Sequence, residues 1–270
     1  MNSGSGPIGI FDSGIGGLTV ASSVHELLPR EALLYYGDTL HMPYGEKGRK
    51  SIEQYSLRIA EHLLEQGAKV LVMACNSASA TASEAVRKLA GDSVPVIDVI
   101  DPAVGAVAEM KQDIRVGVIG TKATIRSEVY PDRISALLPA AQVKCLETPL
   151  LAPIVEEGLA DGPISREVLR HYLGHSALQD IDCLILACTH YPLLQKEIEV
   201  YYQGRVEVLD SAGLTAQAVQ EALKKTGSAH PGEERTAHRF LISEHTDAFA
   251  NSAQRFFGRD IQLEEARLRV

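Results

Sequence analysis

Two cysteines in this chain stand at the ends of apolar segments and are followed at once by small or polar residues. Cys75 follows the run 70–74, and Cys188 follows a second such run, 183–187. Both runs have the composition of buried strands. Open α/β sheets bind ligands at the carboxyl ends of their strands, and a helix that begins there favours a thiolate. The two positions predict thiol chemistry, provided that the two strand ends face each other.

Two further ionisable residues lie near strand ends of the same kind. Asp12 ends the apolar run 8–11 and opens a glycine-rich turn, 13–17, whose N–H groups at a helix start suit a carboxylate. Asp12 is placed there to orient or deprotonate another group. His190 adds an imidazole two residues after Cys188. The remaining cysteines, Cys145 and Cys183, lie inside predicted strands and keep the ordinary interpretation of buried core residues.

Other interpretations of these motifs are weaker. The glycine run lacks the third glycine of a dinucleotide fingerprint and the Gly-Lys-Ser/Thr of a P-loop. A metal site built on Cys188 and His190 needs two or three more ligands, for which the sequence offers no obvious set. The cysteines show no Cys-x-x-Cys spacing, which argues against structural zinc and a disulfide framework. We therefore predict no bound metal.

Composition narrows the class of protein. With 270 residues, 45% hydrophobic and 23% charged, the chain is typical of a globular protein of one large or two modest domains. A net charge of −9 argues against nucleic-acid binding as the main activity. No apolar run has membrane-spanning length, and the N-terminus lacks the basic and apolar regions of a signal peptide. We expect a cytoplasmic protein with reduced thiols and no membrane partner.

Predicted strands alternate with predicted helices along the chain. The strands are expected at 8–11, 33–36, 70–74, 94–97, 115–120, 142–146, 183–187, 206–209 and 240–242. Helices are expected at about 19–28, 51–66, 79–89, 164–173, after Pro192, from 211 to 223, and finally up to about 257, with a short helical start at 154–157 and a surface loop at 226–236. This alternation predicts an α/β fold with mostly parallel sheets.

A weak internal repeat suggests two related halves. The segment 8–12 resembles 116–121, and 70–75 resembles 184–188 at a similar offset. We expect two similar βα-repeat domains packed face to face around a central cleft, with the two cysteines meeting across it. The first domain would comprise residues 1–98 plus 211–270 and carry Cys75, and the second would comprise 99–210 and carry Cys188.

Short motifs occur in a fixed order along the chain: F-D-S-G-I-G-G-L at Phe11–Leu18, G-D-T at Gly37–Thr39, P-Y-G at Pro43–Gly45, C-N-S-A at Cys75–Ala78 and C-T-H-Y-P at Cys188–Pro192. Together they are far more specific than any one alone. From about Ile8 to Phe257 the chain resembles the glutamate racemases of the cofactor-independent aspartate/glutamate racemase superfamily. One departure is Ser77, where that family usually has threonine. Serine keeps the hydroxyl group, so we expect substrate binding to survive.

The resemblance implies interconversion of L- and D-glutamate without a cofactor, which supplies D-glutamate for peptidoglycan and so for cell-wall synthesis and cell shape. Racemisation removes the α-proton from one face of the substrate and returns a proton to the other. One base cannot serve both faces of a fixed substrate, so two thiols alternate between thiol and thiolate. By the same resemblance, Cys75 acts on D-glutamate and Cys188 on L-glutamate.

The resemblance also assigns roles around the two cysteines. Asp12 assists Cys75 and His190 assists Cys188, and both also belong to the binding site. Asp38 and Glu156 are supporting candidates. The substrate's carboxylates and ammonium would be held by Ser13, Pro43, Tyr44, Gly45, Asn76, Ser77, Thr121, Thr124 and Thr189.

Three rival functions stay open at this point. Aspartate racemase or another superfamily member shares the two-cysteine logic, and a substrate assay would separate it. A non-catalytic ligand-binding α/β protein has no need of thiols at both strand ends. A redox thiol protein would need Cys75 and Cys188 to form a disulfide reversibly. The sequence does not decide between a monomer and a homodimer.

Overall fold

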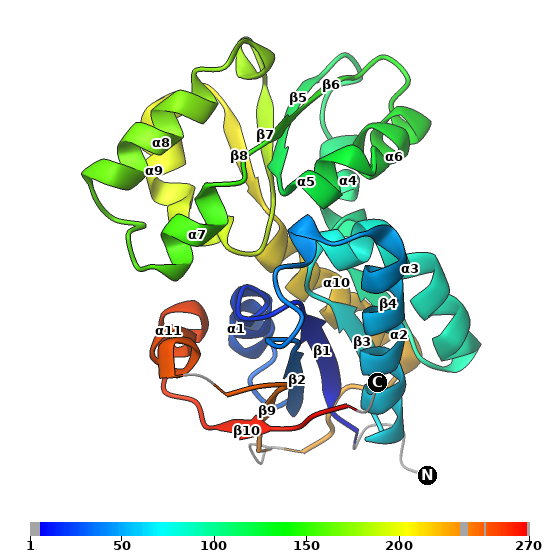
Figure 1. Ribbon diagram of the computed structural model, residues 1–270. Coiled ribbons are helices and arrows are strands. Elements are labelled where there is room, and N and C mark those ends of the chain that lie inside the picture. Colours follow the sequence, from blue (N-terminus) through cyan, green and yellow to red (C-terminus); the bar gives the residue numbers. More distant parts are fainter. Residues whose placement is uncertain (1–5, 233–236, 246, 269–270) are drawn as a thin grey trace.

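The computed structural model describes residues 6–232, 237–245 and 247–268, and the side chains of 247–251 are left aside. Two parallel sheets lie one above the other (Figure 1). The larger sheet contains β1 (Ile8–Asp12), β2 (Leu33–Gly37), β3 (Val70–Met73), β4 (Val96–Asp98), β9 (Arg239–Ile242) and β10 (Leu263–Glu265). The smaller sheet contains β5 (Arg115–Gly120), β6 (Gln142–Glu147), β7 (Cys183–Ala187) and β8 (Glu207–Asp210).

The two sheets repeat one strand order. The larger is β10-β9-β2-β1-β3-β4 and the smaller is β6-β5-β7-β8, and every pairing between these strands is parallel. In each sheet the first strand of the repeat, β1 or β5, lies between the second (β2 or β6) and the third (β3 or β7). The fourth strand, β4 or β8, pairs with the other edge of the third. Thus β3, which leads to Cys75, and β7, which leads to Cys188, occupy equivalent positions. The predicted α/β class is confirmed, as is the repeat.

Helices cover both faces of the sheets. They are α1 (Leu18–Leu27), α2 (Arg49–Glu65), α3 (Asn76–Ala90), α4 (Asp101–Ala108), α5 (Lys122–Arg126), α6 (Val129–Leu137), α7 (Leu151–Glu156), α8 (Pro163–Leu173), α9 (Gln195–Tyr202), α10 (Ser211–Thr226) and α11 (Asp247–Phe257). Short 3-10 turns are η1 (Tyr44–Glu46), η2 (Gly91–Ser93), η3 (Ser176–Leu178) and η4 (Tyr191–Leu194). In the larger sheet α1 and α10 pack against each other on one face, and α2 packs against α3 on the other.

The core follows the alternation of side chains along each strand. Ile10 of β1 and Val72 of β3 belong to a cluster that includes α1 and α10 and continues into the smaller sheet. Their neighbours Phe11 and Leu71 face the second cluster, under α2 and α3. Because both faces are covered, the central strands are continuously apolar rather than alternating. The core therefore lies on both faces of the larger sheet.

The structure corrects several sequence-based boundaries. The helix expected at 79–89 begins at Asn76, because Cys75 itself caps it: its Sγ accepts a hydrogen bond from the N–H of Ala78. Helices α4 and α6 and strand β10 were not predicted, since these segments are short and carry little helical or alternating periodicity. Part of the predicted loop, 233–236, lies outside the described residues. None of the helices in the described part of the chain has the length and hydropathy of a membrane span.

Candidate active site

The carboxyl ends of strands from both sheets line one small pocket. Twelve of the predicted site residues line it: Ser13, Pro43, Tyr44, Gly45, Cys75, Asn76, Ser77, Thr121, Glu156, Cys188, Thr189 and His190. The other three contact residues that line it: Asp12 accepts from the N–H of Gly14, Asp38 accepts from the Tyr44 hydroxyl, and the Thr124 hydroxyl lies within hydrogen-bond distance of Ser77. The sequence interpretation did not single out four further lining residues: Gly14, Ile15, Met42 and Ala152.

Cys75 is placed by the end of β3 and the start of α3. Its side chain is 5% exposed, and its Sγ lies 3.5 Å from the backbone N of Ala78 and 3.7 Å from Oγ of Ser13. Burial, with the nearby Asp12 carboxylate, raises the pKa of Cys75 to about 12, although these two hydrogen bonds oppose the rise. Cys75 is therefore a neutral thiol at pH 7 in the absence of a substrate, and it can donate a proton.

Asp12 lies beneath the glycine-rich turn. Its Oδ2 accepts a hydrogen bond from the N–H of Gly14 at 2.8 Å, while Oδ1 has no partner among the described residues. Burial raises the pKa of Asp12, and the His190 cation and the turn N–H groups lower it. A buried carboxylate oxygen without a partner is costly, and an ammonium group or a thiol proton from a ligand or neighbour would satisfy it.

Cys188, just beyond β7, begins a chain of three polar groups. Its Sγ lies 3.6 Å from Nδ1 of His190, and Nε2 of the same ring lies 2.7 Å from Oε1 of Glu156 on α7. Burial lowers the pKa of His190, but Cys188 and then Glu156 outweigh it, so the pKa rises to about 10. His190 is thus an imidazolium at pH 7, and its ring joins the Cys188 sulfur to the Glu156 carboxylate.

The glycine-rich turn lets the second sheet approach closely. A Cβ atom on Gly16 would lie 2.4 Å from Oγ1 of Thr189 and 2.5 Å from Nδ1 of His190. Thr19, at the start of α1, donates a hydrogen bond to the carbonyl oxygen of Thr189 at 2.9 Å. Position 16 therefore requires a glycine for a steric reason: any larger side chain would collide with Thr189 and His190, which come from a distant part of the chain.

Three hydroxyl groups form a cluster between the starts of α3 and α5. Oγ of Ser77 lies 2.9 Å from Oγ1 of Thr121 and 3.3 Å from Oγ1 of Thr124, and the two threonine oxygens are 3.1 Å apart. Thr121 also caps α5. A Cβ on Gly45 would lie 2.8 Å from Cβ of Thr121, so η1 packs tightly against this cluster. Serine at position 77 keeps the hydroxyl that these contacts require.

Asp38 acts behind the pocket wall rather than in it. Its Oδ2 accepts a hydrogen bond from the Tyr44 hydroxyl at 2.6 Å, and its Oδ1 accepts one from Ser243 at 3.1 Å. His41 lies 2.9 Å from the same carboxylate. Burial and then Asp38 hold the pKa of Tyr44 far above its usual value, so it remains a neutral hydroxyl. Asp38 thereby fixes the ring of Tyr44, which lines the pocket.

The sequence interpretation missed Tyr130 entirely. Its hydroxyl donates a hydrogen bond to Oδ1 of Asn76 at 2.8 Å, and Nδ2 of Asn76 has no partner in the ranges that the structure describes. No local signal in the sequence could have linked Tyr130 to Asn76, because its helix, α6, was not predicted and the two residues are far apart along the chain.

The site has a possible proton donor and a possible proton acceptor on two walls of one pocket. One thiol is held neutral at the end of the larger sheet, and the other lies beside an imidazolium at the end of the smaller one. All four cysteines are free. Over the described residues, no group of three or more His, Cys, Asp or Glu side chains is arranged to hold a metal ion. An acid and a base on two different walls suit proton transfer to and from a bound molecule.

Comparisons with known proteins agree with this geometry. A family model described as Asp/Glu/Hydantoin racemase matches residues 9–219. A glutamate racemase from Thermus thermophilus is 45% identical over 251 residues, which cover 92% of this chain and 91% of that relative.

Solved structures are similar over nearly the whole chain. The crystal structure of Francisella tularensis glutamate racemase in complex with D-glutamate matches with a TM-score of 0.90 at 33% identity and covers 97% of both chains. A glutamate racemase isoform from Bacillus anthracis matches with a TM-score of 0.92 at 34% identity and covers 98% of both. The chain therefore belongs to the Asp/Glu/hydantoin racemase family.

Proposed function

We propose that this protein is a cofactor-independent glutamate racemase that interconverts L- and D-glutamate by proton transfer at the α-carbon. One observation carries the proposal: Cys75 and Cys188, at equivalent strand ends of two sheets, line the same pocket in different electrostatic settings. The similarity to curated glutamate racemases favours glutamate over aspartate as the substrate. As the family resemblance implies, the product D-glutamate would serve peptidoglycan synthesis in the cytoplasm.

In the proposed step one proton leaves one face of the substrate α-carbon and one proton is added to the opposite face. In the L-to-D direction the Cys188 thiolate removes the α-proton and becomes a thiol, while the Cys75 thiol delivers its proton to the opposite face and becomes a thiolate. His190 stabilises the Cys188 thiolate before the step, and Asp12 assists Cys75. The reverse direction starts from the exchanged protonation states. Since the α-proton of an amino acid is very weakly acidic, preorganised donors must stabilise the developing carbanion.

Unpaired polar groups support the proposed binding roles. Oδ1 of Asp12 suits the substrate ammonium, and Nδ2 of Asn76 suits a carboxylate. The hydroxyl cluster of Ser77, Thr121 and Thr124 offers further donors. The remaining groups in the proposed site are Ser13, Pro43, Tyr44, Gly45 and Thr189, with Asp38 and Glu156 holding Tyr44 and His190.

We also propose two domains, 1–98 plus 211–270 and 99–210. The sheets support this division, because strands β1–β4, β9 and β10 form the larger sheet and strands β5–β8 form the smaller sheet. Helix α10, which begins at Ser211 after the cap at Asp210, returns the chain to α1 of the larger sheet. The pocket then lies between the two domains, with one thiol from each.

Isotope exchange tests the function directly. Purified protein is incubated with L-glutamate in deuterated water without any added cofactor. We expect the circular dichroism of the solution to decay to zero while one deuterium enters the α-position of each product molecule. The absence of both changes would refute the proposal. Parallel incubation with L-aspartate separates the aspartate racemase alternative.

Cysteine variants test the two-base assignment. Cys75→Ser and Cys188→Ser should each lose full racemisation, because one face of the substrate then lacks its proton carrier. Cys145→Ser is the matched control, since that thiol is partly exposed in β6 and lies outside the pocket. Full racemisation by either pocket variant would contradict the assignment. A reversible disulfide between the pocket cysteines would instead favour a redox protein.

A further inference from the structure

Asn76 lines the pocket with an amide side chain that could recognise an anionic substrate. It is the first residue of α3, directly after Cys75, and its side chain is 2% exposed. An asparagine side chain presents either its oxygen or its NH₂ group, and the two faces have opposite effects on a carboxylate. Something must therefore choose the orientation of this amide if it binds an anionic substrate.

The Tyr130 hydroxyl makes that choice. It is buried, and its one hydrogen bond among the described residues goes to Oδ1 of Asn76. Burial and the Asp98 carboxylate hold the pKa of Tyr130 well above its usual value, so the hydroxyl keeps its proton. If the amide were reversed, its NH₂ group would donate to the Tyr130 oxygen, and the buried hydroxyl proton would then have no acceptor among the described residues. The observed arrangement turns Nδ2 of Asn76 away from Tyr130 and leaves it unpaired among the described residues.

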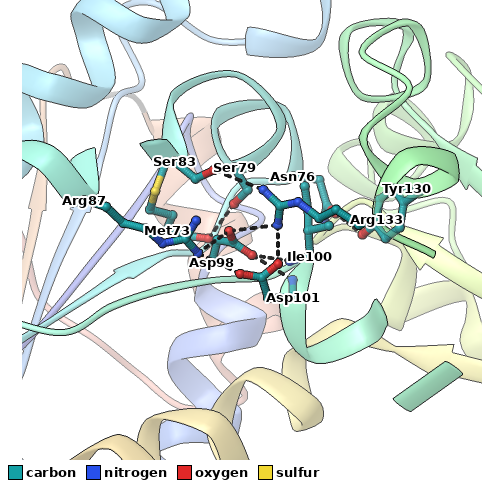
Figure 2. A network of polar contacts seen from close by, with 10 residues as sticks. All are labelled: Met73, Asn76, Ser79, Ser83, Arg87, Asp98, Ile100, Asp101, Tyr130 and Arg133. Carbon is teal, nitrogen blue, oxygen red and sulfur yellow. Dashed lines mark hydrogen bonds and ion pairs between the residues drawn. The ribbon is translucent and has the colours of Figure 1, made fainter. Parts of the chain in front are cut away.

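Helix α6, which carries Tyr130, is held by an ion-pair network to the end of the larger sheet (Figure 2). Arg133 lies one turn after Tyr130. Its Nη1 contacts Asp98 at 3.2 Å and also pairs with Asp101, and its Nη2 donates to Ser83 at 3.2 Å. This network joins α6, α4, α3 and the end of β4.

Asp98 is the centre of this network. Its carboxylate is fully buried, and besides Arg133 it accepts a hydrogen bond from Arg87 at 2.8 Å. The backbone N–H groups of Ile100 and Asp101 donate to its other oxygen at 2.9 and 2.8 Å. A buried charge with this many partners holds a defined geometry. The position of α6, and hence of the Tyr130 hydroxyl, is fixed against the end of β4 and against α3, the helix that begins with Asn76.

We propose that Tyr130 is a positioning residue that fixes the Asn76 amide with Nδ2 toward the pocket, where it recognises a carboxylate of the substrate. This inference rests on the proposed racemase function and extends it to a residue on the opposite half of the molecule. Tyr130 does not touch the substrate in this account. It acts through Asn76, and Arg133 holds it in place.

The Tyr130→Phe variant tests the inference, because it keeps the ring and removes only the hydroxyl. We expect KM for glutamate to rise about tenfold, which corresponds to the loss of one oriented hydrogen bond, with a smaller change in kcat. Because the equilibrium constant of a racemisation is one, kcat/KM must fall by the same factor in both directions. Tyr202→Phe is the matched control: it removes a buried phenol hydroxyl from α9, outside the pocket, and should leave both constants unchanged.

A double-mutant cycle separates positioning from a general structural effect. Affinity for racemic glutamate is measured by calorimetry for Tyr130→Phe, Asn76→Ala and the double variant, so that turnover is not needed. In the Asn76→Ala background, removal of the Tyr130 hydroxyl should weaken binding by no more than about twofold. An additive loss in the double variant would overturn the inference, and so would an unchanged KM in Tyr130→Phe. A wild-type protein that fails to racemise glutamate would refute the proposed function instead.

Discussion

The contact between His190 and Glu156 gives the sharpest test of the electrostatics at Cys188. The change is Glu156→Gln, which removes the negative charge but keeps the side-chain length and a hydrogen-bond acceptor for Nε2 of His190. Burial lowers the pKa of His190, and Cys188 and then Glu156 overcome it and raise the pKa to about 10. Without the carboxylate charge, the pKa of His190 must fall, and in the proposed mechanism His190 then stabilises the Cys188 thiolate less.

The size of the effect follows from the exposure of the pair. A hydrogen bond to a charged group contributes about 1.5–3 kcal/mol. The side chain of Glu156 is 38% exposed, so water screens it, and glutamine retains a neutral hydrogen bond. We therefore expect a loss of about 1 kcal/mol, which corresponds to about 0.7 pKa unit for His190. The raised pKa also stabilises the folded protein fully below pH 6.5, and this contribution is lost as the pH rises through about 10.

The assay is the pH dependence of kcat/KM for L-glutamate. The activity of both proteins should fall on the alkaline side as the imidazolium loses its proton, and this limb should lie about 0.7 pH unit lower in Glu156→Gln. At neutral pH kcat/KM should fall about fivefold. Glu157→Gln is the matched control, because that carboxylate is adjacent but exposed. An alkaline limb that does not move in Glu156→Gln would refute the assignment of His190 as the cationic partner of Cys188.

Two further substitutions test the packing around the site. Gly16→Ala should displace the His190 ring, because the new Cβ would lie 2.5 Å from its Nδ1, and kcat/KM should fall by about 10- to 100-fold in a steady-state assay. Arg133→Met should remove one partner from the fully buried Asp98 carboxylate, which keeps its other donors, and should cost about 1–2 kcal/mol, measured as the free energy of unfolding in urea.

Matched controls accompany both substitutions. Gly48→Ala adds a methyl group where no atom lies within 4 Å, so its kcat/KM should not change. Arg126→Met removes an ion pair whose arginine side chain is 67% exposed, and the free energy of unfolding should not change measurably. Wild-type activity in Gly16→Ala would contradict the steric argument. Equal stability of the two arginine variants would contradict the role given to Asp98.

Local patterns in the sequence predicted the fold class and most of the central strands. Double burial makes the central strands continuously apolar, and this signal located β1, β3, β5 and β7 to within a residue or two. The repeat of short motifs then indicated that the two cysteine strands occupy equivalent positions. Where burial was partial or the element short, as in α4, α6 and β10, no clear periodicity existed to be recognised.

The sequence by itself determined the chemical groups: two strand-terminal thiols, an aspartate beneath a glycine turn and a histidine two residues after the second thiol. Residue type and local spacing are sufficient for this, because a strand end and the loop after it are short-range features. Only the tertiary structure decided what each group contacts. Glu156 reaches His190, Asp38 lies behind Tyr44, and Tyr130 orients Asn76. These contacts join segments that are distant in sequence, and only the packing of the two sheets and their helices brings them together.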